Sequence, residues 1–271
     1  MANSRFARLA AFPFRAAHVA RFDARILALS GRWLVRSREH TNYTFHLEPL
    51  NLEHLAWWVA DVADVHVTDA RKYMAEAEDD EQLKRHVQAA TLDSSRRRLA
   101  DTEVRLHKRL GWYALVRALR PLHVVETGTD KGLGAVVLAA ALLRNGEGRL
   151  TTMDVNPNAG YLIQREYATV TTLTIADSLQ AIPKLPRPVD FFLHDSCHTR
   201  THEFAEYQAV APLLSERAVV LSDNSHGSDA LPTWAEATGR RFSYFQERPV
   251  GHWYPGGGIG LAKSLLQARY R

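Results

Sequence analysis

Residues 123–144 read HVVETGTDKGLGAVVLAAALLR, and this stretch decides the fold. Its beginning is rich in β-branched side chains and ends at Gly128, which predicts a strand followed by a tight turn. Residues 132–144 are small and apolar, and they predict a buried helix. A strand that leads through a glycine turn into a helix is the opening unit of a sheet with parallel strands.

The same alternation continues towards the C-terminus. Further strands are predicted at 149–155, 169–176, 189–194 and 218–223, with helices at 203–214 and 231–239. The last two predicted strands, 241–247 and 258–263, are separated by about ten residues, too few for a parallel crossover. We therefore predict an α/β fold for residues 121–271: a doubly wound, Rossmann-like, seven-stranded sheet with an antiparallel closing hairpin.

Residues 1–120 are predicted to form a helical extension that acts as a lid or an oligomer contact. Apolar spacing indicates helices at 50–65, with Asn51 as a candidate cap, and at 67–78, with Thr68 as cap. Residues 79–108 are highly charged and also have helical spacing. An N-terminal helix with a solvated Arg face is expected, although Pro13 interrupts its apolar pattern.

The positive charge of the chain is confined to its first forty residues. The net charge is +4, whereas residues 1–40 alone carry eight Arg against two acids, a net of +6. A transit peptide or membrane-surface helix is one interpretation of such an arm. Because the rest is slightly acidic, we expect no nucleic-acid partner. The single Cys197 and the lack of a membrane-length apolar run favour a cytoplasmic protein without disulfides or a membrane span.

Glycines and polar residues follow the first three predicted strands, where doubly wound sheets bind their ligands. Asp154 follows the second strand and could accept hydrogen bonds from ribose hydroxyls. Asp177 and Ser178 follow the third, where they suit an adenine edge or a helix cap. The first strand is followed by Glu126, Gly128, Thr129, Gly132 and Gly134, whose glycine spacing differs from the GxGxxG dinucleotide fingerprint.

These segments together resemble a class I S-adenosylmethionine-dependent methyltransferase, from about residue 95 onwards. Glu126-x-Gly128-x-x-x-Gly132 is similar to the first motif of that class, and Asp154 to the ribose-binding acid of its second. Within the class, the chain resembles the metal-dependent O-methyltransferases, which include catechol O-methyltransferase and the macrolide and aminocoumarin sugar O-methyltransferases. The resemblance implies S-adenosylmethionine as cofactor, held by the residues after the first three strands.

A second set of polar residues follows the fourth and fifth strands. Asp195 and the pair Asp223-Asn224 should meet at one edge of the sheet, and such oxygen ligands suit Mg²⁺ or another divalent cation. The resemblance implies the same ligand set. His198, three residues after Asp195, is the candidate general base, at a place where catechol-type enzymes carry Lys. His226 is a second candidate.

Three other interpretations remain open at this point. A zinc site could use His194, Cys197, His198 and His202, but strand and helix separate these residues and no Cys pair supports it. A nicotinamide-dependent oxidoreductase could use a similar sheet. A catalytically inactive methyltransferase-like module could dock through the basic arm. The favoured prediction is Mg²⁺-dependent O-methylation of a sugar, catechol or polyketide-like hydroxyl, with Asp195 and His198 as catalytic residues and a possible homo-oligomer through the N-terminal helices.

Overall fold

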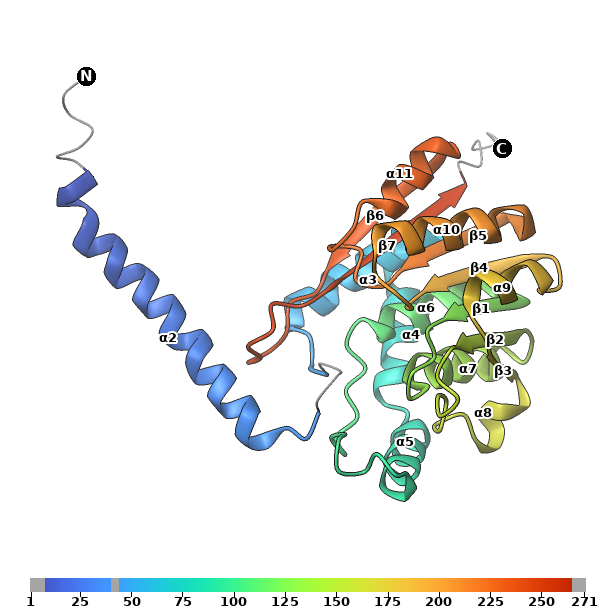
Figure 1. Cartoon of the computed structure of the whole chain (residues 1–271), viewed down its shortest axis with the longest axis horizontal. Coiled ribbons are helices and arrows are strands. Elements are labelled where there is room, and N and C mark those ends of the chain that lie inside the picture. Colours follow the sequence, from blue (N-terminus) through green and yellow to red (C-terminus); the bar gives the residue numbers. More distant parts are fainter. Residues whose placement is uncertain (1–7, 40–43, 265–271) are drawn as a thin grey trace.

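The computed structural model describes residues 8–39 and 44–264, and its core is one mixed sheet. The strand order is β3-β2-β1-β4-β5-β7-β6 (Figure 1). The first five strands pair in parallel, whereas β7 pairs antiparallel with both β5 and β6. The strands are β1 (His123–Thr127), β2 (Arg149–Asp154), β3 (Thr171–Ile175), β4 (Val189–His194), β5 (Leu214–Ser222), β6 (Arg240–Gln246) and β7 (Gly258–Ser264). The predicted doubly wound sheet and its antiparallel closing strands are confirmed.

Side chains alternate between the two faces of the sheet, as the pleat of a strand requires. Val124 and Phe191 belong to the apolar cluster under one face, whereas Val125 and Phe192 belong to the cluster under the other. The first face is covered by α3 (Pro49–Ala63), α4 (Val67–Glu78), α5 (Glu81–Asp93), α6 (Arg109–Leu119) and α7 (Leu133–Asn145). The second face is covered by α9 (Ser178–Ala181), α10 (Arg200–Val210) and α11 (Ala230–Ala237). A further short helix, α8 (Arg165–Thr169), precedes β3.

The helices α3 to α6 share the hydrophobic core of the sheet. Leu55, Leu83 and Trp112 are buried in the same cluster as Leu138 and Leu221. The boundary predicted at residue 120 stays a prediction, and the apolar packing is continuous across it. The helical region is therefore part of the wall of the sheet rather than a loose cover.

Three details of the predicted helices were wrong. Asn51 does not cap a helix: its amide donates to the Gln246 carbonyl and accepts from the Arg248 N–H, which ties α3 to the end of β6. The cap of α4 is His66, whose Nδ1 accepts from the Thr68 N–H. The charged stretch 79–108 is helical only over α5, and residues 94–108 run mostly as turns and irregular chain to the start of α6.

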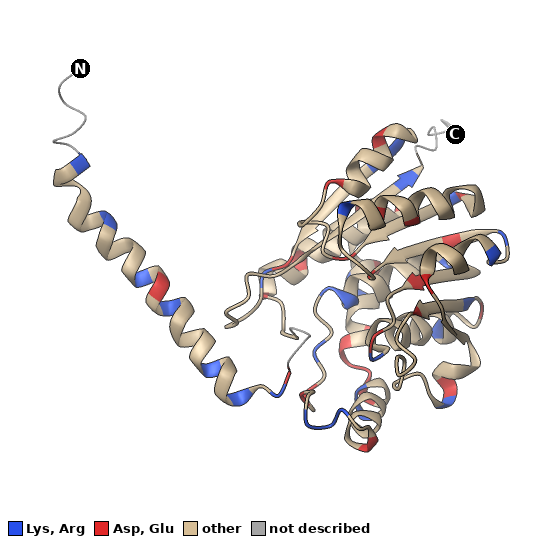
Figure 2. Cartoon of the chain, viewed as in Figure 1, with Lys and Arg blue, Asp and Glu red and all other residues tan. Residues whose placement is uncertain are grey.

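The helix α2 (Phe12–Arg36) extends away from this body (Figure 1). Pro13 lies in its first turn, where a missing N–H costs nothing, so it does not interrupt the helix as predicted. None of the residues of α2 is buried. Most of the charged residues of α2 are arginines, and Asp23 is its acidic residue (Figure 2). Among the described residues, no helix has the length and apolarity to cross a membrane.

Candidate active site

A cavity of about 910 Å³ opens at the carboxyl ends of the parallel strands. Most of the predicted site residues line it: Glu126, Gly128, Thr129, Gly134, Asp195, His198, Asp223, Asn224 and His226. Gly132, Asp154, Asp177 and Ser178 are outside its lining. The structure therefore brings the β1 loop together with the acids after β4 and β5, while the residues after β2 and β3 lie beyond the cavity wall.

The β1 loop packs tightly against the end of β4. Gly128 has a φ of 85°, and a Cβ there would lie 2.0 Å from the Asp195 carbonyl oxygen. A Cβ at Gly134 would lie 2.2 Å from Glu126 Oε1. Both glycines are therefore required by close approach, and they set the position of Asp195 and Glu126 in the cavity.

Asp154 and Asp177 hold backbone turns at the ends of their strands. Asp154 accepts hydrogen bonds from the N–H groups of Asp130 (2.7 Å) and Asn156 (2.8 Å). Asp177 accepts from the Gln180 N–H and caps α9, which is the cap alternative of the sequence interpretation. These bonds orient both carboxyl groups at the same edge of the sheet as the β1 loop.

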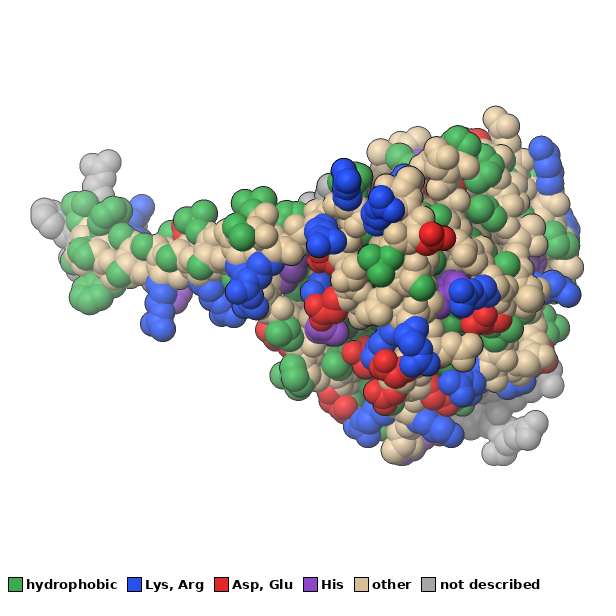
Figure 3. Space-filling view, turned by 90° about the horizontal axis from the view of Figure 1, so that it is seen from below, with side chains coloured by type: hydrophobic (Ala, Val, Ile, Leu, Met, Phe, Trp, Pro, Cys, Tyr) green, Lys and Arg blue, Asp and Glu red, His purple; other side chains and the backbone are tan. Residues whose placement is uncertain are grey.

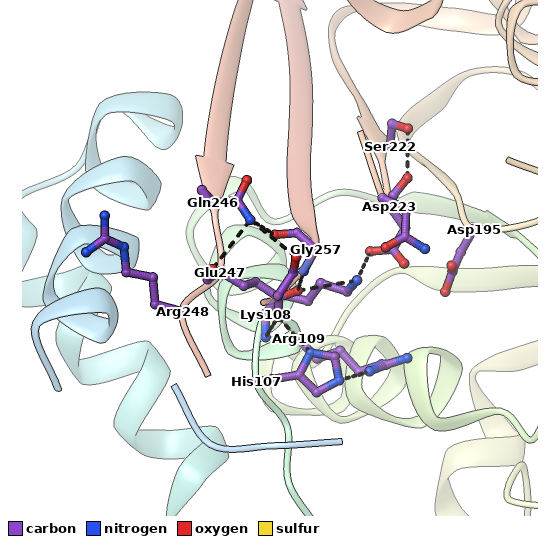
Figure 4. A network of polar contacts seen from close by, with 12 residues as sticks. His107, Lys108, Arg109, Asp195, Ser222, Asp223, Gln246, Glu247, Arg248 and Gly257 are labelled. Atoms are coloured by element: carbon purple, nitrogen blue, oxygen red, sulfur yellow. Dashed lines mark hydrogen bonds and ion pairs between the residues drawn. The ribbon is translucent and has the colours of Figure 1, made fainter. Parts of the chain in front are cut away.

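A lysine from the start of α6 reaches into the acids at the ends of β5 and β6 (Figure 4). Lys108 Nζ lies 2.5 Å from Asp223 Oδ1 and 3.7 Å from Glu247 Oε2. All three side chains are nearly inaccessible, at 7%, 5% and 1% exposure. Glu247 is held in turn by His107 Nδ1 and by the N–H groups of Lys108 and Gly257. Lysine and carboxylates thus form one buried charge network.

The charges of this network shift each other's pKa values. Burial alone would lower the pKa of Lys108, but Asp223, Glu247 and Asp195 outweigh it and raise that pKa above its ordinary value. Burial would raise the pKa of Glu247, yet Lys108 and His107 lower it to about 2. Burial and the adjacent Asp223 raise the pKa of Asp195, whereas Lys108 keeps that of Asp223 low. Lys108 is therefore a charged ammonium in the native state.

The predicted Mg²⁺ does not fit beside this ammonium. A Mg²⁺ ion bound to Asp223 Oδ1 at about 2.1 Å would lie within about 4.6 Å of Lys108 Nζ. The repulsion between charges of +2 and +1 at that distance is about 7 kcal/mol at an effective dielectric constant of about 20. The Asn224 amide oxygen also faces Gly257, where a Cβ would meet it at 2.8 Å. Asp195, His198 and Asp223 offer ligand atoms within 4.8 Å of one another, but one of them, Asp223, is already paired with the Lys108 ammonium.

His198 lies beside Asp195 and Asn224. Its Nε2 is 3.1 Å from the Asn224 amide nitrogen and 3.6 Å from Asp195 Oδ1. An amide NH₂ group only donates, so Nε2 is the acceptor and the ring proton sits on Nδ1, which is 3.8 Å from Glu203 Oε1. The side chain is 32% exposed and lines the cavity. His198 thus lines the cavity with its Nε2 lone pair held by the Asn224 amide, which has to turn aside before Nε2 can accept a proton from a bound molecule.

A second buried network supports the segment that carries Asp195 and His198. Glu206 accepts hydrogen bonds from Thr127 and Ser196 and contacts the His194 and His202 rings. Burial would lower the pKa of His194, but Glu203 and Glu206 raise it to about 9. Although His194, His198 and Glu203 offer atoms within 4.8 Å of one another, a protonated His194 is an ion-pair partner rather than a zinc ligand.

Sequence reasoning missed Lys108, Arg109 and Glu247, which all line the cavity. Glu247 could have been found, because it follows β6, which runs parallel to β5 across the intervening β7. The strand-end rule that selected Asp195 and Asp223 applies to it equally. Lys108 and Arg109 had no such signal, since they come from outside the sheet.

Comparisons with known proteins agree with this geometry. Residues 125–225 match the sequence profile of a family described as a methyltransferase domain. The O-methyltransferase TomG from Streptomyces achromogenes, involved in tomaymycin synthesis, has 20% identity and a TM-score of 0.53, with 69% of this chain and 90% of that chain covered. A methyltransferase from Geobacter sulfurreducens has 19% identity and a TM-score of 0.51, with 67% and 89% covered. No curated protein matches the chain.

The profile match assigns a methyltransferase domain to residues 125–225, and the shared fold agrees with the resemblance to class I S-adenosylmethionine-dependent methyltransferases. The matched residues run from β1 to the turn after β5, so they include the β1 loop, Asp195, His198 and Asp223. Lys108 and Glu247 lie outside the matched segment, one on each side of it.

Glu126 gives the stability of the protein a testable pH dependence. Burial raises its pKa from 4.5 to about 7. Between these values the unfolded chain releases a proton that the folded protein keeps, so stability should fall as pH rises from about 4.5 to 7. Glu126→Gln should remove up to about 3 kcal/mol of that fall, measured by urea unfolding across this pH range. The exposed Glu216→Gln is the control, and parallel curves for Glu126→Gln and the wild type would contradict the assignment.

Proposed function

We propose that this methyltransferase transfers the methyl group to a hydroxyl oxygen of a small molecule bound in the cavity. The observation that carries the proposal is the placement of His198: its accepting Nε2 lines the same cavity as the β1 loop. A proton acceptor and a cofactor loop that share one cavity are what hydroxyl methylation requires. The name of TomG, an O-methyltransferase, is in line with the same reaction type.

In the proposed reaction, S-adenosylmethionine lies against the β1 loop, with Glu126, Gly128, Thr129, Gly132 and Gly134 on the methionine side. Asp154 accepts from the ribose hydroxyls, and Asp177 with Ser178 faces the adenine. These assignments come from the family resemblance. They agree with the placement of all these residues at the carboxyl edge of β1, β2 and β3.

The chemistry is a direct displacement. His198 Nε2 takes the hydroxyl proton, and the oxygen lone pair attacks the methyl carbon of the sulfonium. The carbon–sulfur bond breaks and its electron pair stays on sulfur, so the products are the methyl ether and S-adenosylhomocysteine. Asp195, 3.6 Å from Nε2, favours the imidazolium that forms. No step uses the predicted Mg²⁺, because Lys108 holds the position of its positive charge.

The acceptor belongs to the class of sugar, catechol or polyketide-like hydroxyl compounds. A cavity of about 910 Å³ has the volume of a typical cofactor or drug-sized ligand site. The exposed free thiol of Cys197 agrees with the predicted cytoplasmic location, where thiols stay reduced. A homo-oligomer through the N-terminal helices stays a prediction.

Calorimetry with the full chain tests the cofactor assignment. S-adenosylhomocysteine should bind, whereas NAD should not, and the opposite result would favour the oxidoreductase alternative. Asp154→Asn should weaken S-adenosylhomocysteine binding about tenfold, because the amide is a poorer acceptor for ribose hydroxyls. Asp229→Asn, an exposed partner of Arg200, is the matched control and should bind as the wild type does.

Turnover tests the base assignment. A panel of phenols, catechols and sugars is screened by release of S-adenosylhomocysteine, and variants are compared on the first acceptor found. His198→Ala should lower kcat by at least about 100-fold with unchanged cofactor affinity, because the proton acceptor is lost. His226→Ala lines the same cavity and is the control. If His226→Ala loses the activity and His198→Ala keeps it, the roles are reversed.

A further inference from the structure

We infer that the Lys108 side chain takes the place of a metal ion beside Asp223 in the acceptor site, so that methyl transfer by this protein is independent of a divalent metal ion. The inference rests on the proposed O-methyl transfer and specifies how the acceptor oxygen is held. It contradicts the Mg²⁺ prediction and gives the oxygen set Asp195, Asp223 and Asn224 a different partner.

The position of the ammonium carries the argument. Lys108 Nζ lies 2.5 Å from Asp223, the aspartate predicted to bind Mg²⁺, and Glu247 stands 3.7 Å away on the other side. Figure 4 shows the side chain extended from the start of α6 towards both carboxylates. A metal ion in contact with Asp223 would therefore have to displace the lysine from a site where it is 93% covered.

The surroundings fix the lysine in this place. Glu247 Oε1 is close to the backbone N–H of Lys108 itself (3.2 Å), and its Oε2 accepts from Gly257. His107, which precedes the lysine, has a left-handed backbone with a φ of 40° and bonds the same carboxylate. A side chain held at its backbone and at its tip is preorganised.

The Lys108 ammonium can stabilise negative charge on one substrate oxygen, which is the role that Mg²⁺ was predicted to have. An ammonium carries three protons, and Lys108 lines the cavity beside His198 and Asp195. A hydroxyl oxygen bound to Nζ gains a positive neighbour as His198 removes its proton, and this stabilises the developing negative charge. A single ammonium does not chelate, so the acceptor needs only one hydroxyl and no neighbouring second oxygen.

Metal titration of the full chain tests this inference without using catalysis. Mn²⁺ is added to the wild type and binding is followed by electron paramagnetic resonance and calorimetry. We expect no stoichiometric site in the wild type. Lys108→Met removes the charge with little change in shape, and it should bind Mn²⁺ at least about tenfold more tightly, because the acids are then unpaired. Lys131→Met, the other lysine of the cavity, is the control and should gain nothing.

Two results would overturn the inference: a stoichiometric Mn²⁺ site in the wild type that Asp223→Asn abolishes, or no gain of affinity in a folded Lys108 variant. Lys108→Gln replaces Lys108→Met if the latter does not fold, and the wild-type titration stands without either. S-adenosylhomocysteine binding is measured on the same samples. If the wild type does not bind S-adenosylhomocysteine, that result counts against the proposed function, whatever the metal titration shows.

A second, independent inference concerns α2: we propose that it lies on an anionic lipid surface. Phe12, Val19 and Phe22 are 57–65% exposed and share one helical face, while Leu27 and Leu34 beside them are 71% and 72% exposed. Arg21, Arg25, Arg32 and Arg36 recur at intervals of four and seven and share another face. Figure 3 shows hydrophobic side chains along one edge of the arm and basic ones along the opposite edge.

This combination fits a membrane interface better than a protein partner of neutral charge. A basic face draws a helix to anionic headgroups, and an apolar face of Phe, Val and Leu enters the boundary of the acyl chains. With 25 residues, the helix gives a stripe about 37 Å long. Asp23 is the acid of this helix and lies on its apolar side, about 20° around the axis from Phe12, so it leaves the charge of the arginine face nearly uncompensated.

Vesicle sedimentation of the full chain tests the lipid proposal. The protein should sediment with phosphatidylcholine vesicles that contain one third phosphatidylglycerol, and not with pure phosphatidylcholine. Replacing Arg21, Arg25 and Arg32 together by Ser should weaken binding about 100-fold, and Phe22→Ser should also weaken it. The triple control replaces three exposed arginines of the body by Ser: Arg97, Arg187 and Arg217. Absence of vesicle binding, with a dimer in light scattering that Phe22→Ser dissociates, would overturn the proposal in favour of a second copy.

Discussion

The ammonium of Lys108 lies between carboxylates from two different strands, and the rest of the site depends on this buried charge balance. Asp223 and Glu247 are almost wholly covered, and an unpaired carboxylate in such a place is strongly destabilising. The single ammonium pairs with both carboxylates and joins the start of α6 to the ends of β5 and β6. Helical region and sheet therefore meet at the acceptor side of the cavity through charge as well as through apolar packing.

The opposite side of the cavity is organised by hydrogen bonds around Glu206. This buried carboxylate binds Thr127 from β1, His194 from β4 and Ser196 from the loop after it. Because the loop also carries Asp195 and His198, its position is fixed from beneath by a residue that does not line the cavity. The zinc alternative arose because His194, His198 and His202 lie close together in sequence. In the structure, Glu203 and Glu206 contact the His194 ring and raise its pKa, so ion pairs account for this cluster.

The sheet could be predicted because its strands are short apolar runs that end in glycine or acid, and because parallel strands end at one edge. That rule alone predicts that Asp195, Asp223 and His198 lie close together. It could not reach Lys108, since the charged stretch before α6 has helical spacing yet contains an irregular segment. The direction of Lys108 depends on the left-handed turn at His107, for which the sequence offers no glycine signal. The Mg²⁺ prediction rests on the oxygen set alone, because the sequence does not reveal the lysine that pairs with Asp223.

The link between Lys108 and Glu247 also bears on the order in which the chain folds. The β1 loop and its neighbours β2 and β3 are formed by residues close together in sequence, so the cofactor side can assemble early. The acceptor side joins residues 139 positions apart, and it is complete only when the closing hairpin has added β6 and β7 to the sheet. A nascent or C-terminally shortened chain would expose Lys108 and Asp223 without Glu247 and the strands that cover them, and such a species is a natural substrate for chaperones and proteases.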